Sequence, residues 1–182
     1  MQQEVIIAGF GGQGVLFTGQ LISYAAMVEG KEVTWIPSYG PEMRGGTANC
    51  TVVVSDEEIG SPLVKNPTAV MAFNLPSLEK FEPLVKKDGL LVVNSSMVNR
   101  PVTRKDIKVV NLPANDIAES LGSKRSVNMV MLGALLANMD LLPLEVIEQS
   151  LETHLPERHR RFLEANKVAL RKGAEYQAVV IQ

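Results

Sequence analysis

The residues near the start of the chain that are best suited to binding chemistry are glycines, spaced Gly9-x-Gly11-x-x-Gly14 between a short apolar run and an apolar helical pattern. Glycine suits such a turn because the backbone must turn tightly, approach an anion closely and let the next helix pack on the sheet. The following helix would direct free N–H groups and its positive end toward that anion. The spacing therefore predicts a phosphate-binding turn. Its candidate residues are Gly11, Gly12, Gln13 and Gly14.

A second glycine-rich segment, predicted to be a loop from Pro37 to Gly46, combines turn residues with a phenol, a carboxylate and a guanidinium. Its glycines allow positive φ or a close approach to another chain. Arg44 could bind a phosphate or a carboxylate through two parallel hydrogen bonds. Alternatively, Arg44 pairs with Glu42 and stiffens a subunit contact. The candidate site residues of this segment are Ser38, Tyr39, Gly40, Pro41, Glu42, Arg44, Gly45 and Gly46.

The elements that must position these two segments alternate along the chain between short β-rich runs and helical patterns. This alternation predicts an α/β fold, a Rossmann-like three-layer sandwich with a mainly parallel sheet, formed as a single domain over residues 1–182. Predicted strands lie at Glu4–Ala8, Glu32–Ile36, Ala48–Val54, Ala69–Phe73, Leu90–Asn94 and Lys108–Asn111. Predicted helices lie at Val15–Val28, Pro76–Lys86, Ala114–Leu121, Ser126–Asn138, Leu144–Leu151 and Arg158–Lys172. Loops at the carboxyl ends of neighbouring strands line one crevice, so we expect the two glycine-bearing segments to face each other.

The predicted helix Ser126–Asn138 is apolar on all sides, which predicts burial against the sheet or against another subunit. Asn128 interrupts this apolar helix and is a further candidate site residue. It could cap the helix, bridge to a loop or contact a ligand, and a satisfied buried amide is the favoured role. At the end of the last helix, Gly173 is expected to act as the C-terminal stop.

Cysteine and histidine are too sparse to predict a catalytic residue or a metal site. Cys50 is the only cysteine and lies on a predicted strand, where we expect a small core residue. One thiolate cannot form an intramolecular disulfide or hold an iron–sulfur cluster alone. His154 and His159 are separated by Pro156, and no carboxylate or thiol pattern completes a metal site with them. We expect them at a solvated helix start, with a basic contact to a partner as the alternative.

Charge and hydropathy exclude several classes of function. A formal net charge of −2 gives no reason to expect nucleic acid binding, and no apolar run reaches the length of a membrane span. Met-Gln-Gln-Glu at the start does not resemble a secretion signal, so we expect a cytoplasmic protein. NAD binding requires an acidic residue at the end of the second strand, where Pro37 and Ser38 stand. A different phosphate-bearing ligand is favoured, and glycines that serve only helix packing remain an alternative.

The two glycine-bearing segments together resemble those of the gamma subunit of the 2-oxoacid:ferredoxin oxidoreductases. The similar pieces are Gly9-Phe-Gly-Gly-Gln-Gly14, Ser38-Tyr-Gly-Pro-Glu-Met-Arg-Gly-Gly46 and, less specifically, Asn128-Met-Val-Met-Leu-Gly-Ala-Leu135. The chain looks most like the separate gamma subunit of the 2-oxoglutarate (KorC-like) branch, with the branched-chain 2-oxoacid enzymes close behind.

This resemblance implies one subunit of a complex that converts a 2-oxoacid, CoA and oxidised ferredoxin into acyl-CoA, CO₂ and reduced ferredoxin. It implies thiamine-binding alpha and beta subunits and a ferredoxin-like subunit as partners, which would hold thiamine diphosphate, Mg and the iron–sulfur clusters. This chain has no Gly-Asp-Gly motif and one cysteine, so no cofactor is expected on it alone.

Coenzyme A is then the leading phosphate ligand at the two glycine-bearing segments, which would lie at the interface with the thiamine-binding subunits. The basic stretch from His154 to Arg161 could contact the nucleotide end of CoA. An isolated chain is expected to be inactive and could form a homodimer. The alternatives are a stand-alone NAD(P)-binding Rossmann oxidoreductase and a non-catalytic nucleotide-binding assembly module.

Overall fold

A computed structural model describes residues 1–39 and 46–181, except for the side chain of Tyr39. The described residues form a seven-stranded sheet in the order β2-β3-β1-β4-β5-β6-β7. The strands are β1 (Gln2–Phe10), β2 (Glu32–Tyr39), β3 (Thr47–Ser55), β4 (Ala69–Ala72), β5 (Leu90–Asn94), β6 (Lys108–Leu112) and β7 (Val179–Val180).

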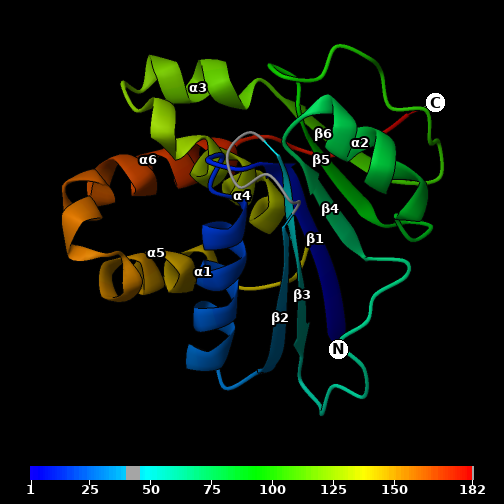
Figure 1. Cartoon of the computed structure of the whole chain (residues 1–182), viewed down its shortest axis with the longest axis horizontal. Helices are drawn as coiled ribbons and strands as arrows, with labels where there is room; N and C mark the ends of the chain where they lie inside the picture. Colours follow the sequence, from blue (N-terminus) through cyan, green and yellow to red (C-terminus); the bar gives the residue numbers. More distant parts are fainter. Residues whose placement is uncertain (40–45, 182) are drawn as a thin grey trace.

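Helices cover both faces of this sheet, as Figure 1 shows. The helices are α1 (Val15–Val28), α2 (Leu75–Phe81), α3 (Ala114–Ser120), α4 (Val127–Asn138), α5 (Leu144–His154) and α6 (Leu163–Gly173). Three 3₁₀ turns are η1 (Glu82–Leu84), η2 (Lys124–Ser126) and η3 (Glu157–Phe162). On β1, Val5 and Ile7 join the core under α1 and α4, whereas Ile6 and Ala8 join the core under α2. Alternate residues of a strand point to opposite faces, so this pattern produces the expected three layers.

Strand directions confirm a mainly parallel sheet. β1, β4, β5 and β6 pair in parallel, and β2 runs the same way because β3 is antiparallel to both β1 and β2. β3 therefore lies between β1 and β2, so these two parallel strands are not neighbours in the sheet. At the other edge, the short β7 is antiparallel to β6 and was not predicted, since two residues carry no periodic signal.

Among the predicted boundaries that were wrong, three have a local reason. Residues 37–39 continue β2 and are not part of the loop, because β2 is an edge strand on which Pro37 needs no N–H. The helix predicted to reach Lys86 ends at Phe81, and Pro83 then stands in a 3₁₀ turn. The helix predicted from Arg158 begins as the 3₁₀ turn η3 and becomes α-helical at Leu163.

Gly173 is the last residue of α6, as expected, and it has a second role in helix packing. A Cβ at Gly173 would lie 1.9 Å from the carbonyl oxygen of Val130 on α4. A Cβ at Gly133 on α4 would likewise lie 1.9 Å from the carbonyl oxygen of Leu170 on α6. Glycine is therefore required at both positions because two helix backbones approach each other closely.

A buried carboxylate, Glu82, holds the connection between β5 and β6. Its oxygens accept hydrogen bonds from the backbone N–H groups of Thr103 and Arg104, the Thr103 hydroxyl and the Arg100 guanidinium. Burial by itself raises the pKa of Glu82, but these hydrogen bonds outweigh it and the pKa lies below its usual value. The ionised form therefore stabilises the fold above the ordinary pKa of a glutamate, and this contribution is lost as pH falls through the lowered value.

Glu82→Gln is expected to lower the free energy of unfolding by about 2 kcal/mol at pH 7, because Arg100 loses its charged partner. The difference from the parent chain should shrink at acidic pH, as pH falls below the ordinary pKa of a glutamate and through the lowered pKa of Glu82. Urea unfolding at both pH values measures this, with Glu79→Gln on the exposed side of α2 as the control. An equal loss at both pH values would show that the charge of Glu82 is not the source of the effect.

Candidate functional site

The glycine turn joins β1 to α1 and has the backbone conformation that only glycine adopts readily. Gly12 has φ 98° and Gly14 has φ 78°, both in the left-handed region. A Cβ at Gly14 would lie 2.6 Å from the Asn128 amide nitrogen, whereas a Cβ at Gly12 would meet nothing within 4 Å. No side chain in the described part of the chain caps the first turn of α1. The turn therefore leaves open space beside the positive end of a helix.

The second glycine-bearing segment begins and ends at the same rim of the sheet as this turn. The Gly11 N–H donates to the Gly46 carbonyl oxygen at 3.0 Å, and Phe10 pairs with Thr47. The expected convergence is confirmed at Gly46, although its cause is the antiparallel β3 and not a pair of parallel neighbours. Ser38 is exposed on β2 opposite Asn49.

The rest of this segment stays a prediction, because it lies outside the described residues. These positions are Gly40, Pro41, Glu42, Arg44, Gly45 and the side chain of Tyr39.

Gln13 holds the glycine turn in shape through its side-chain oxygen. Its Oε1 accepts hydrogen bonds from the backbone N–H of Phe10 at 2.7 Å and from Asn74 Nδ2 at 3.2 Å. Asn74 is itself oriented, because its Oδ1 accepts the Ser77 N–H and caps α2. A backbone N–H can only donate, so these contacts define the Gln13 amide orientation and leave its Nε2 as the remaining donor.

A second pair of amides is oriented in the same way at the ends of β5 and α3. Asn94 Oδ1 accepts the Ala114 N–H, and Asn94 Nδ2 donates to the Phe73 carbonyl and to Asn115 Oδ1 at 2.8 Å. Asn115 consequently keeps its Nδ2 as a donor. Asn115 was not predicted as a site residue, since an asparagine in the first turn of a helix carries no specific signal.

Asn128 links α4 to the start of α1 and is 5% exposed. Its Nδ2 donates to Thr18 Oγ1 at 3.3 Å and to the Gly14 carbonyl oxygen at 3.5 Å. The favoured role, a satisfied buried amide, is therefore confirmed.

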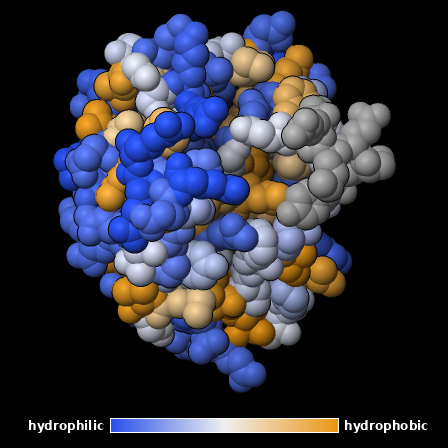
Figure 2. Space-filling view, turned by 60° about the vertical axis from the view of Figure 1, so that its left-hand side comes forward, coloured by the Kyte–Doolittle hydropathy of each residue, from blue (hydrophilic) through white to orange (hydrophobic). Residues whose placement is uncertain are grey.

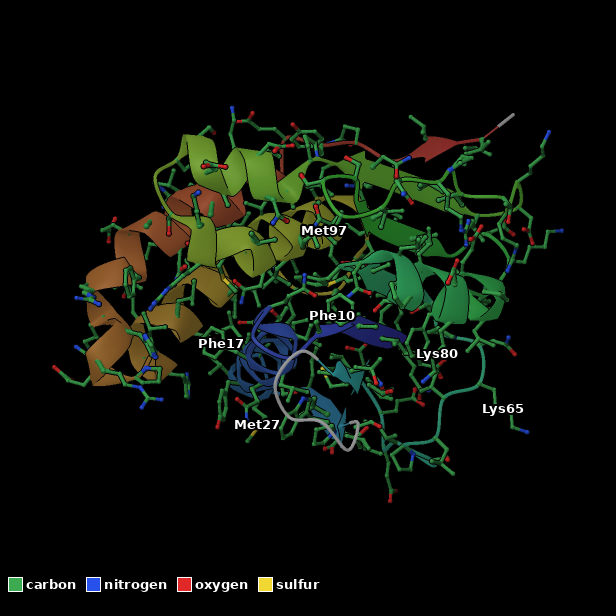
Figure 3. The ribbon with its side chains drawn as sticks, turned by 45° about the horizontal axis from the view of Figure 1, so that its top comes forward. Phe10, Phe17, Met27, Lys65, Lys80 and Met97 are labelled. Carbon is green, nitrogen blue, oxygen red and sulfur yellow. The ribbon has the colours of Figure 1, made fainter. Side chains whose placement is uncertain are left out.

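Two recesses open beside the glycine turn and share Gly12, Gly14, Arg125 and Asn128. The polar recess, of about 510 Å³, is also lined by Gln13, Asn115, Lys124 and Val127. The apolar recess, of about 360 Å³, is also lined by Phe17, Leu155, Pro156, Arg158, His159, Phe162 and Asn166. Figure 2 shows hydrophilic residues over much of this side of the molecule, with hydrophobic residues exposed in a hollow near its centre. In Figure 3, Phe17 lies on the side of α1 that faces α5.

The charges of the side chains around both recesses favour the binding of an anion. Among residues 1–39 and 46–181, no aspartate or glutamate lines either recess, whereas Lys124, Arg125 and Arg158 do. A hydrogen bond from Lys124 to Glu119 raises the pKa of that lysine, so it remains charged at neutral pH. Lys124, Arg125 and Phe162 were not predicted as site residues from the sequence. A basic pair directly before the apolar helix was the signal available for the first two.

Other singled-out residues lie elsewhere or are buried. Cys50 is fully buried, as expected of a core residue, and burial raises the pKa of its thiol to about 12. His154 ends α5 and stacks on Tyr24 with ring centroids 4.1 Å apart, so it does not stand at a helix start. His159 does line the apolar recess, in the turn before α6.

Membrane-spanning helices and clusters of metal ligands are both absent from residues 1–39 and 46–181. None of their helices has the length and hydropathy needed to cross a bilayer. None of their histidine, cysteine and acidic side chains gather in threes as a metal site would require.

Comparison with known proteins places the chain in a family. Residues 4–176 match the family described as pyruvate ferredoxin/flavodoxin oxidoreductase. The chain is 35% identical over 163 residues to the 2-oxoglutarate synthase subunit KorC of Methanothermobacter marburgensis, covering 86% of this chain and 88% of the relative. It is 42% identical over 134 residues to the ketoisovalerate oxidoreductase subunit VorA of that organism, covering 74% of this chain. The chain spans only 28% of that VorA relative.

Solved structures agree with this assignment. The keto/oxoacid ferredoxin oxidoreductase gamma subunit from Geobacter sulfurreducens superposes with a TM-score of 0.84 at 26% identity, covering 96% of this chain and 95% of that one. The 2-oxoglutarate:ferredoxin oxidoreductase from Magnetococcus marinus, with 2-oxoglutarate, coenzyme A and succinyl-CoA bound, shares the fold with a TM-score of 0.87 at 24% identity. That match covers 96% of this chain and 30% of the Magnetococcus chain. The chain thus belongs to the pyruvate ferredoxin/flavodoxin oxidoreductase family, among its gamma subunits.

Proposed function

We propose that this chain is the gamma subunit of a cytoplasmic, thiamine-dependent 2-oxoacid:ferredoxin oxidoreductase that acts on 2-oxoglutarate. The KorC relative, matched over 88% of its length, supports 2-oxoglutarate, and the VorA relative makes a branched-chain 2-oxoacid the second candidate. Thiamine diphosphate, Mg and the iron–sulfur clusters do not fit the described residues, which hold one cysteine and no metal-ligand group of three. Those groups would belong to alpha, beta and ferredoxin-like partner subunits, with ferredoxin as the acceptor.

We further propose that the polar recess binds phosphate groups of coenzyme A. The observation that carries this proposal is that the recess presents donors and no carboxylate among the described residues. The Gln13 and Asn115 amide nitrogens, the Arg125 guanidinium and the start of α1 all border it. Backbone N–H groups, a helix N-terminus and a guanidinium are the partners that phosphates favour. The Magnetococcus structure with coenzyme A bound is consistent with this ligand class.

In the reaction, the residues of this chain would bind and orient. Holding the phosphates at the polar recess would let the flexible thiol arm of CoA extend toward the acyl group on the partner subunits. Such positioning converts an encounter between separate molecules into a step within one complex. The isolated chain would then bind without catalysing.

The stand-alone NAD(P) alternative loses support from the strand order. In a dinucleotide fold, the strand that carries the ribose-binding carboxylate lies beside the strand that enters the glycine turn. Here β3 separates β2 from β1. The polar side chain at the end of β2, Ser38, is neither acidic nor on the adjacent strand.

Arg125→Ala in the assembled complex is expected to raise the KM for CoA about tenfold, because one charge-assisted hydrogen bond to phosphate is lost. The kcat at saturating CoA and the KM for the 2-oxoacid should stay within twofold. Arg160→Ala is the control, since Arg160 is exposed and lines neither recess. An unchanged KM for CoA, with normal complex assembly by size-exclusion chromatography, would remove the polar recess from the CoA site.

A further inference from the structure

We infer that Asn94 is a positioning residue for the proposed phosphate site, because it fixes which end of the Asn115 amide faces the polar recess. Asn115 Nδ2 would be the atom that donates to a phosphate oxygen of the substrate. This inference rests on the proposed function, since it concerns the same recess. It adds a buried residue that lines neither recess and yet determines the polarity of one wall.

The orientation of the Asn94 amide is set by two backbone groups of opposite kind. Asn94 is the last residue of β5 and is fully buried. Its Oδ1 accepts the Ala114 N–H at 3.2 Å, and its Nδ2 donates to the Phe73 carbonyl oxygen at 3.3 Å. An N–H can only donate and a carbonyl can only accept, so turning the amide round would lose both hydrogen bonds. Buried polar groups without partners are costly, and Asn94 therefore keeps one orientation.

This orientation is passed on to Asn115 through one hydrogen bond. Asn94 Nδ2 also donates to Asn115 Oδ1 at 2.8 Å. Because an amide carries its acceptor and its donor on different arms, Asn115 Nδ2 must point away from Asn94. Among residues 1–39 and 46–181, no group accepts a hydrogen bond from Asn115 Nδ2. Asn115 is partly exposed and lines the polar recess, so this nitrogen is the donor left for an anion.

The other amide on the polar recess, Gln13, is held by two groups. Gln13 Oε1 accepts both the Phe10 N–H and Asn74 Nδ2, so the loss of Asn74 would leave Phe10 to hold the orientation. The Asn115 oxygen is bonded by Asn94 alone within the described part of the chain. Removal of the orienting asparagine should therefore affect ligand binding more at Asn94 than at Asn74.

The test measures the KM for CoA of the assembled complex in a double-mutant cycle. Asn115→Ala is expected to raise this KM about tenfold, because a hydrogen bond to a charged phosphate is lost. Asn94→Ala should raise it about fivefold with kcat within twofold, and should have no further effect in the Asn115→Ala background. Asn94→Ser, whose hydroxyl is too short to replace Nδ2, takes the place of Asn94→Ala if that complex does not assemble.

Asn138→Ala is the matched control. Asn138 also makes three hydrogen bonds, from its Nδ2 to the carbonyl oxygens of Ala134 and Tyr176 and to its Oδ1 from the Ala178 N–H. It is the last residue of α4 and lines neither recess. Its loss should lower the thermal unfolding midpoint much as the loss of Asn94 does, and should leave the KM for CoA within twofold. A raised KM would thus not follow from lost stability alone.

The outcomes separate this inference from the proposed function. An equal rise in KM from Asn94→Ala in the parent and in the Asn115→Ala background would show that Asn94 acts through packing, which overturns the inference. An unchanged KM in Asn94→Ala or in Asn115→Ala, with a raised KM in Arg125→Ala, also overturns it and leaves the CoA site in place. If all three single variants keep the parent KM, both the inference and the proposed CoA site are wrong.

Discussion

Val130→Asp is expected to prevent the chain from folding. Val130 is in the middle of α4, is fully buried, and belongs to the core between α4, α6 and the sheet. An unpaired carboxylate at such a position must lose its hydration or take up a proton, and either costs several kcal/mol. Domains of this size are stable by about 5–15 kcal/mol, so this substitution removes much or all of that margin. Far-UV circular dichroism and urea unfolding of the purified chain measure the loss.

A matched control comes from α6. Val168 is 45% exposed on that helix, so Val168→Asp should change the free energy of unfolding by no more than about 0.5 kcal/mol. If Val130→Asp kept the unfolding midpoint of the parent chain, α4 would not be a buried helix. The apolar pattern that predicted its burial would then have another explanation.

Gly173→Ala is expected to destabilise the chain by about 3 kcal/mol, the upper part of the range for overpacked cores. The added methyl would stand 1.9 Å from the Val130 carbonyl oxygen, which cannot move aside without separating α4 from α6. Gly133→Ala should have a similar effect through the Leu170 carbonyl oxygen. Because α4 carries Asn128 and α6 follows η3, the same shift should also disturb both recesses.

The measurement is urea unfolding of each variant, with Gly60→Ala as the control. A Cβ at Gly60 would meet nothing within 4 Å, and φ there does not require glycine, so that substitution should be close to neutral. Losses below about 0.5 kcal/mol for both Gly133→Ala and Gly173→Ala would show that the two helices are not in backbone contact.

Local sequence patterns predicted much of the fold. The bounds of α1 and β5 are those expected from the sequence, because the signals that begin and end them lie within a few residues. The glycine turn was predicted for the same reason, since tight turns and left-handed φ values depend on residue type at each position. Burial of Asn128 and Cys50 followed from the apolar residues around each in the sequence.

The order and direction of the strands could be established only from the tertiary structure. Alternation of apolar and polar residues predicts a strand but does not say which neighbour it pairs with, or in which direction. The placement of β3 between β1 and β2 therefore could not be predicted from those patterns. The glycines at 133 and 173 show the same limit, because the atoms that exclude a side chain at each belong to another helix.

In the candidate site too, some features followed from the sequence and others only from the tertiary structure. The sequence by itself determined the open glycine turn at the start of α1, because its geometry depends on neighbouring residues. Only the tertiary structure brought Arg125 and Phe162 to that turn, from more than 100 residues further along the chain. Local backbone preference acts over a few residues, whereas a recess is formed by side chains that meet only after the helices have packed. The glycine turn could thus be predicted from the sequence, whereas the shape of the recesses around it could not.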